Sequence, residues 1–252
     1  MKMVILTALG VGGATVIGSV LGFCFKNISH RFSDIVMSFA AGVMLAAAVM
    51  GLVVPSLEYG GAAGLPICIV GIFCGALCLN LLDKLVPHLH RLSGVDQETH
   101  SGQSEQLNKV LLFVLAIAIH NLPEGIAAGV GFGTGDVGEA VTIAAGIALQ
   151  NVPEGMVIIA PMLAAGMSKG RTFIAALLTG VVEVLGALLG YLAVTVSTAI
   201  LPFALAFAGG TMLYVISDEM IPETHAHGSE RGATYALLAG FCLMLAMSHC
   251  LG

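Results

Sequence analysis

The chain has 252 residues, of which 58% are hydrophobic and only 10% are charged, and its mean hydropathy is +1.00. This composition excludes an ordinary water-soluble globular protein and indicates a polytopic membrane protein whose solvent is the lipid bilayer. The formal net charge is −6 at pH 7, so we expect cations as partners and no nucleic acid.

Apolar runs of about 20 residues, the length that crosses the hydrocarbon layer as a helix, recur along the whole chain. They predict an all-α fold, because an outer-membrane barrel would show a weak alternating pattern instead. The eight predicted spans are 3–25, 34–54, 64–86, 108–132, 138–164, 171–196, 200–217 and 232–251. We expect the first span to be retained, since it is longer than the apolar core of a signal peptide and has no clear cleavage site. We also expect 1–252 to form one transmembrane domain with a flexible Ser/Gly/Gln-rich loop at about 88–107.

The basic residues predict the orientation of the spans. All but Lys2 lie in or beside alternate loops: Lys26, Arg31, Lys84, Arg91, Lys109, Lys169, Arg171 and Arg231. By the positive-inside rule these loops face the cytoplasm, and both termini face the extracellular or periplasmic side. The loops on that outer side carry Glu58, Asp136 and Glu139, which would attract cations, although acids left over from the same sorting explain them equally well.

One six-residue pattern occurs in two consecutive predicted spans. It reads His-Asn-Leu-Pro-Glu-Gly at 120–125 and Gln-Asn-Val-Pro-Glu-Gly at 150–155. In each copy the first residue and the glutamate are four apart, so they share one face of a helix about one turn apart, with the asparagine beside them. The proline between them removes a backbone donor, which predicts a kink where the polar groups cluster.

Three glutamates, Glu124, Glu154 and Glu183, fall near the middle of predicted spans, and no Lys or Arg lies at a comparable depth. An ionised carboxylate at the bilayer centre costs about 2.5–3.5 kcal/mol even on a lenient insertion scale, so protons or bound cations must relieve the charge. The alternative interpretation is that all three stay protonated and hydrogen-bond between helices.

The side chains around these glutamates favour metal binding. His120, Gln150, Asn121 and Asn151 add an imidazole nitrogen and amide oxygens to the carboxylates. This ligand set suits Zn²⁺, Cd²⁺, Fe²⁺, Mn²⁺ or Co²⁺ better than Cu⁺ or K⁺. Because the fourth and fifth spans run antiparallel, the two motif faces can meet at the midplane, as broken helices do in transporters with inverted repeats.

The two motif copies on consecutive spans resemble the signature of the ZIP family of divalent-metal transporters. Further points of similarity are Phe-Ala-Ala-Gly-Val-Met-Leu at 39–45, Glu183, and Ile-Ser-Asp-Glu-Met-Ile-Pro-Glu at 216–223. The similarity covers the whole chain. It is greatest to the compact prokaryotic GufA-type and ZupT-like branch, because the chain has neither the large extracellular domain nor the long cytoplasmic loop of many animal members.

The resemblance implies eight helices arranged as three, two and three, with the outer triplets related by inverted symmetry, and it implies a homodimer. It also implies a midplane centre that holds two metal ions. One site would use His120, Glu124, Gln150 and Glu154, and the adjoining site would use Asn121, Glu124, Asn151, Glu154 and Glu183, with the shared glutamates bridging. Some members have aspartate at the position of Asn151, so the second site carries less negative charge here.

The resemblance further suggests a cytoplasmic exit route for the ion. Its residues follow the third and seventh predicted spans: Asp83, His88, His90, Asp218, Glu219, Glu223, His225 and His227. For each residue alone, a solvated helix end explains the polar side chain as well.

These inferences predict a transporter rather than an enzyme. A divalent metal ion, zinc first, would enter the cytoplasm by alternating exposure of the midplane site, as substrate and not as cofactor. The expected location is the plasma membrane, which in a prokaryote is the inner membrane. Three alternatives stay open: a metal exporter, a metal sensor and an intramembrane metalloenzyme. The metalloenzyme is disfavoured because the chain lacks HExxH, the zinc-binding motif of metalloproteases.

Overall fold

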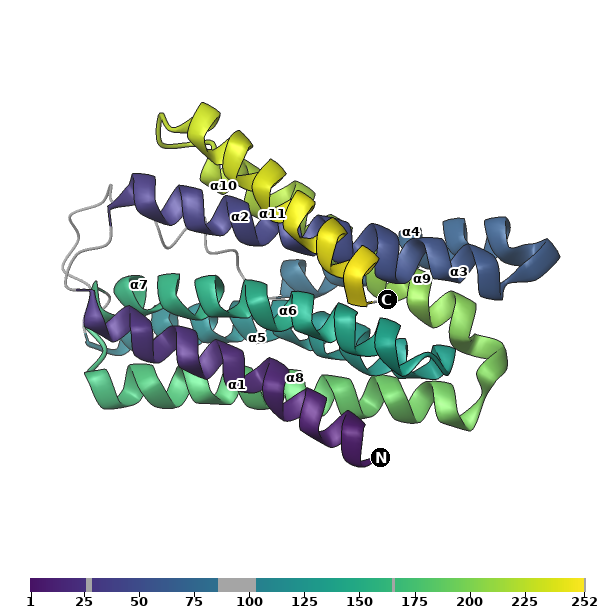
Figure 1. Ribbon diagram of the computed structural model, residues 1–252. Coiled ribbons are helices and arrows are strands. Elements are labelled where there is room, and N and C mark those ends of the chain that lie inside the picture. The colour runs from purple at the N-terminus through teal and green to yellow at the C-terminus, as the bar shows by residue number, and fades with distance from the viewer. Residues whose placement is uncertain (26–28, 86–102, 165, 252) are drawn as a thin grey trace.

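The computed structural model describes residues 1–25, 29–85, 103–164 and 166–251, with side chains throughout except at Asp83, Leu85 and 103–116. Every regular element in these ranges is a helix, which confirms the predicted all-α class. The α-helices, labelled in Figure 1, are α1 (Lys2–Cys24), α2 (His30–Ala48), α3 (Val54–Tyr59), α4 (Gly64–Leu85), α5 (Gln103–Gly131), α6 (Val137–Val157), α7 (Ile159–Ala164), α8 (Lys169–Val196), α9 (Leu201–Val215), α10 (Ile221–Thr224) and α11 (Glu230–Leu251). Two π turns join consecutive helices, at Val49–Val53 between α2 and α3 and at Ile216–Met220 between α9 and α10.

Seven helical stretches in the described ranges are long and apolar enough to cross a membrane. They are Lys2–Cys24, His30–Tyr59, Gly61–Leu82, Val137–Ala164, Lys169–Val196, Thr198–Thr224 and Glu230–Leu251. The 29-residue helix α5 packs beside α8 and α6, although many of its side chains lie outside the described set. The chain is therefore a polytopic α-helical membrane protein, as its composition predicts.

Three predicted spans, the second, the fourth and the seventh, have wrong boundaries. The second spans His30–Tyr59 instead of 34–54. It begins at His30 because the Ser29 side chain accepts a hydrogen bond from the Phe32 backbone N–H and caps the helix there, and it continues through a π turn into α3. The seventh continues to Thr224 instead of ending at residue 217. The helix does not stop at residue 217 because the backbone continues through the π turn at Ile216–Met220 into α10. In addition, α5 begins at Gln103, inside the predicted loop of about 88–107.

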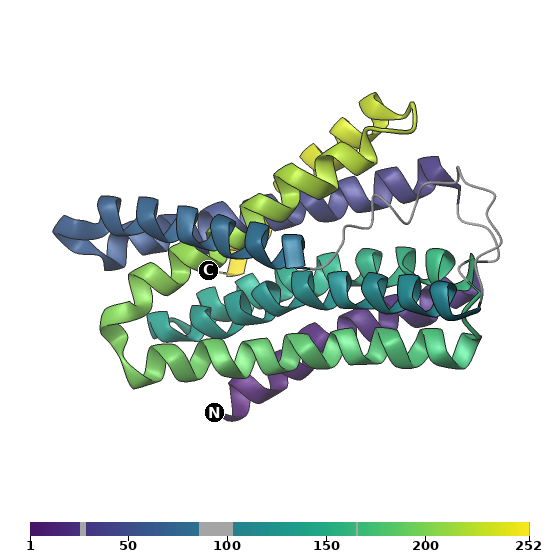
Figure 2. The ribbon, with the colours of Figure 1, turned by 180° about the vertical axis from the view of Figure 1, so that it is seen from behind.

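Glycines let the helices pack in two groups. In the first group, a Cβ at Gly12 or Gly125 would collide with the backbone of α8, and one at Gly155 with that of α1. In the second group, a Cβ at Gly42 would meet the backbone of α11, and one at Gly75 that of α9. Figures 1 and 2 show α1, α5, α6 and α8 as one layer and α2, α4 and α11 as the other, with α9 leading from the first layer into the second.

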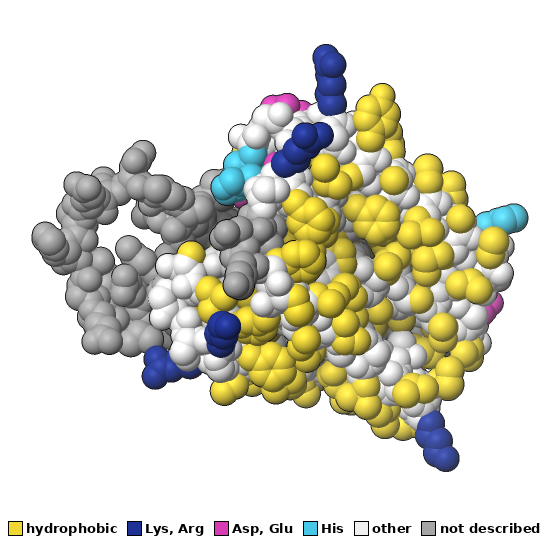
Figure 3. Space-filling view, turned by 60° about the vertical axis from the view of Figure 1, so that its left-hand side comes forward, with side chains coloured by type: hydrophobic (Ala, Val, Ile, Leu, Met, Phe, Trp, Pro, Cys, Tyr) yellow, Lys and Arg dark blue, Asp and Glu magenta, His cyan; other side chains and the backbone are white. Residues whose placement is uncertain are grey.

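The outer surface of these helices is apolar. Large side chains such as Leu6, Phe73, Leu178 and Val196 are exposed. Figure 3 shows hydrophobic side chains spread over one face, with Lys and Arg at its margin. Apolar side chains of this kind are favourable in contact with lipid and unfavourable in contact with water. The helices can lie in lipid because their backbone polar groups bond to one another inside each helix.

Candidate metal centre

Both motif copies lie within the first helix group, on helices that pack against each other. Helix α5 continues past Pro123 to Gly131, whereas α6 ends at Val157, four residues after Pro153. A turn at Ile158 then leads into α7. The helix therefore ends just after the second motif, while Pro123 does not end α5.

Four residues predicted for the first metal site gather in one polar cluster. The Gln150 side-chain amide donates to Glu124 Oε1 at 3.0 Å, and both side chains are buried. Glu154 interacts electrostatically with His120, and Glu124 with Glu154 and Glu183. The two motif faces therefore meet, as the antiparallel arrangement predicts.

Three oxygen atoms in this cluster, Glu124 Oε2, Gln150 Oε1 and Asn151 Oδ1, are buried and accept no hydrogen bond from any described residue. A buried acceptor without a donor costs about 1–3 kcal/mol, which a cation or a proton would remove. In the described ranges, no group of three or more His, Cys, Asp or Glu side chains is arranged to hold a metal ion by itself. His120, Glu124 and Glu154 thus do not form such a group in this arrangement, and the amide oxygens without donors beside them are further ligands that divalent ions accept.

The residues predicted for the second site bond to one another. Glu183, fully buried on α8, accepts hydrogen bonds from the Asn121 side-chain amide at Oε1 and from that of Asn151 at Oε2, the latter at 2.7 Å. The hydroxyl of Thr15 on α1 also donates to Oε1, at 2.7 Å. Thr15 was missed by the sequence analysis, because a single threonine in an apolar span carries no signal of its own.

Glu219 lies beside the cluster and not in a separate exit segment. Its Oε1 is 3.0 Å from His120 Nε2, and the two side chains are 24% and 17% exposed. The π turn at Ile216–Met220 carries this glutamate, and such turns within helices often occur at functional sites. The pair joins α5 of the first helix group to the end of α9 in the second.

The other predicted exit residues are spread out. Asp218 and Glu223 are exposed, while His225 contacts the Ile221 carbonyl and the Thr234 hydroxyl. His227 pairs with buried Asp34 at 3.0 Å and stacks on His30. His88, His90 and the Asp83 side chain lie outside the described residues.

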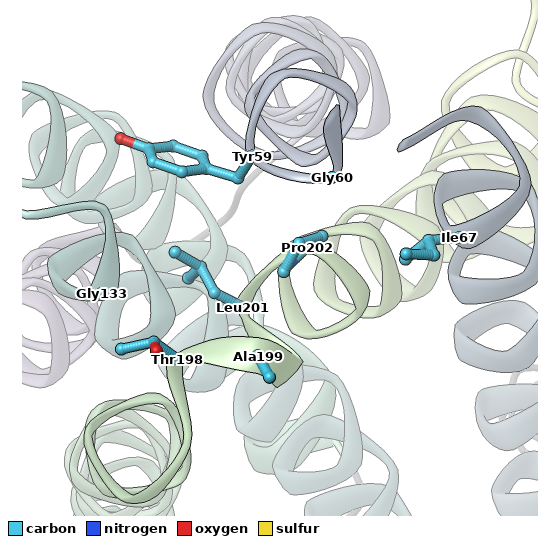
Figure 4. A pocket seen from close by; sticks show the side chains of 8 residues that line it. All are labelled: Tyr59, Gly60, Ile67, Gly133, Thr198, Ala199, Leu201 and Pro202. Carbon is cyan, nitrogen blue, oxygen red and sulfur yellow. The ribbon is translucent and has the colours of Figure 1, made fainter. Parts of the chain in front are cut away.

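A cavity of about 390 Å³ lies elsewhere, where the connections between helices meet at one end of the bundle. Figure 4 shows its lining, which is Tyr59, Gly60, Ile67, Gly133, Thr198, Ala199, Leu201 and Pro202. None of the predicted metal ligands contributes to it, so it belongs to a different part of the molecule from the polar cluster.

Residues 90–248, more than half of the chain, match the family model described as ZIP Zinc transporter. This chain belongs to the ZIP family. The matched region contains both motif copies, Glu183 and Glu219, whereas α1 with Thr15 precedes it.

Curated relatives of this ZIP protein cover nearly its whole length. Zinc transporter GufA of Myxococcus xanthus is 40% identical over 98% of this chain and 98% of its own length. Zinc transporter ZIPB of Bordetella bronchiseptica is 38% identical over 95% of this chain and 78% of its own length. Zinc transporter ZupT of Chlorobaculum parvum is 33% identical over 92% of this chain and 91% of its own length. The predicted resemblance to the GufA-type and ZupT-like branch is confirmed.

Proposed function

We propose that this ZIP protein carries divalent transition-metal ions, zinc first, across the plasma membrane into the cytoplasm, with His120, Glu124, Gln150 and Glu154 as the transport site. The observation that carries the proposal is the buried cluster in which Glu124 and Gln150 bond across two motif helices while other oxygens stay without donors. A proton would satisfy the Glu124 oxygen, but it would not by itself satisfy the amide oxygens of both Gln150 and Asn151. A divalent cation would use them.

The ligand chemistry supports zinc with a broad substrate range. One imidazole, two carboxylates and an amide oxygen suit Zn²⁺, Cd²⁺, Fe²⁺, Mn²⁺ and Co²⁺. The relatives in the GufA-type and ZupT-like branch are named zinc transporters. The ion is the substrate, and the family consists of transporters and not enzymes.

We propose eight spans, with α5 as the eighth and both termini outside. Helix α1 runs parallel to α6, because Gly18 lies against Val152 and Gly22 against Met156. At its other end the chain returns to the start of α6, where the Leu251 carbonyl lies close to Gly138. Both ends of the chain thus lie toward one end of the bundle, as an even number of spans requires, and the basic residues favour the opposite end as cytoplasmic.

A shared irregularity supports the three, two, three arrangement with inverted repeats. The second and seventh spans each pass through a five-residue π turn, and each has a proline two residues later, at Pro55 and Pro222. Two corresponding interruptions of this kind are typical of repeated halves in transporters. The homodimer stays a prediction from the family resemblance.

Alternating exposure of the site is the mechanism that this architecture favours. One layer of helices holds the transport site and is packed through glycines within itself, so it can shift against the other layer without unpacking. The contact between His120 and Glu219 crosses from one layer to the other and would change in such a shift. The chain contains no GxxxxGK[ST] motif, so the ion gradient rather than direct ATP use would supply the driving force.

The test is time-resolved uptake of Zn²⁺, Cd²⁺, Mn²⁺ and Fe²⁺ into proteoliposomes of defined orientation. The native protein is compared with Glu124→Ala and with Glu230→Ala, a matched change at an exposed helix end. We expect inward transport by the native protein and Glu230→Ala, and loss of at least tenfold in rate for Glu124→Ala. Transport only in the outward direction would indicate an exporter. Binding without crossing in either orientation would contradict the transporter and favour a sensor or an enzyme.

A further inference from the structure

The carboxylate of Glu183 is already bound by neutral donors. Three side chains from three helices donate to its two oxygens: Thr15 and Asn121 to Oε1, and Asn151 to Oε2. A carboxylate offers about four acceptor positions, so three of them are used. Hydrogen bonds of this kind stabilise a buried anion without any metal.

The orientation of the Asn151 amide is fixed by a second contact. Its Nδ2 also lies 3.3 Å from the backbone carbonyl oxygen of Val11, which can only accept a hydrogen bond. The nitrogen, and not Oδ1, must therefore face both Val11 and Glu183. A side-chain amide binds a metal ion through its oxygen. Because the nitrogen and not Oδ1 faces Glu183, Asn151 offers no oxygen with which to share an ion with Glu183, and turning the amide to do so would break both contacts.

We infer that this protein holds one metal ion in its centre, because the Asn151 amide with Thr15 and Asn121 occupies Glu183 where a second ion would bind. The inference rests on the proposed transport site. Glu183 then serves as a positioning residue that ties α1, α5 and α6 to α8 behind the site. Residue 151 determines the number of ions held.

An aspartate at position 151 would reverse this arrangement. It has no N–H to donate, so its carboxylate would face the Val11 carbonyl and the Glu183 carboxylate, and three acceptors would converge without a donor between them. Oxygen atoms grouped in this way repel one another and attract a divalent cation. The same backbone can thus hold either an amide bridge or a second ion.

The experiment counts the ions that depend on Glu124. Purified full-length protein is dialysed to equilibrium against radioactive Zn²⁺, and the bound ions per chain are compared with and without Glu124→Ala. The subtraction removes zinc held by histidines at the surface. We expect a difference of one ion in the native protein, two ions in the Asn151→Asp background, and one ion in the Asn151→Ala control, which removes the amide without adding a charge.

The outcomes are distinct. A native difference of two ions would overturn the inference and leave the transport site intact. A native difference of zero would refute the transport site itself and the inference with it. A difference of one in folded Asn151→Asp would overturn the role of residue 151, and if that variant fails to elute as a folded protein on size exclusion, the native count still decides the number of ions.

Discussion

Replacing Thr15 by valine tests whether the bridge on Glu183 stabilises the first helix group. The two side chains have nearly the same shape, so Thr15→Val removes little besides the hydroxyl that donates to Glu183 Oε1 at 2.7 Å. Both residues are buried, so water cannot replace the lost donor. Oε1 keeps its bond from Asn121, so the oxygen is not left without any donor.

The size of the effect follows from two limits. A hydrogen bond to a charged group contributes about 1.5–3 kcal/mol in soluble proteins. Measured interhelical bonds in a membrane protein average about 0.6 kcal/mol and reach about 1.7 kcal/mol. With one donor remaining, we expect Thr15→Val to lower the free energy of unfolding by about 1–1.5 kcal/mol, which is about a tenfold change in the unfolding equilibrium constant.

Reversible unfolding in mixed micelles with increasing SDS measures this change, with Thr15→Ser as the control that keeps the hydroxyl and loses only a methyl group. We expect Thr15→Ser to lie between the native protein and Thr15→Val, and closer to the native protein. If Thr15→Val is as stable as the native protein, or if Thr15→Ser is the less stable of the two variants, the hydroxyl does not stabilise Glu183 and the reasoning is refuted.

Two further outcomes follow from the packing and the ligand chemistry. Gly18→Ala should destabilise the protein by about 1–3 kcal/mol in the same assay, because its Cβ would meet the backbone of Val152, whereas Gly13→Ala on the same helix has open space and should cost nothing. Equal stabilities for the two variants would contradict close packing of α1 on α6. Zinc affinity should fall as the pH is lowered from about 7.5 to 5.5, because binding needs neutral His120 and ionised Glu124, so protons compete with the metal. An affinity independent of pH in equilibrium dialysis would count against these ligands.

The sequence was sufficient for the helical class, most span boundaries and the residues of the polar cluster. Apolar runs must become helices in lipid, because every backbone N–H and C=O needs a partner there. Glutamates inside such runs are costly enough to mark a site, and the repeated spacing of 120–125 and 150–155 places them on matching helix faces. None of this depends on contacts between distant segments.

The tertiary structure alone decided which polar groups meet. Thr15 reaches Glu183 across 168 positions of sequence, and no local pattern records that contact. The sequence cannot tell whether the Asn151 amide turns its oxygen toward a metal or its nitrogen toward a carboxylate. Only the Val11 carbonyl beside it in the folded chain determines the orientation. The local sequence suggested that the seventh span ends before Glu219, but the continuing helix and its π turn bring this residue to His120. Sequence thus determines which groups are buried in the membrane, because burial has a local cost, whereas the choice of partners depends on how the helices pack.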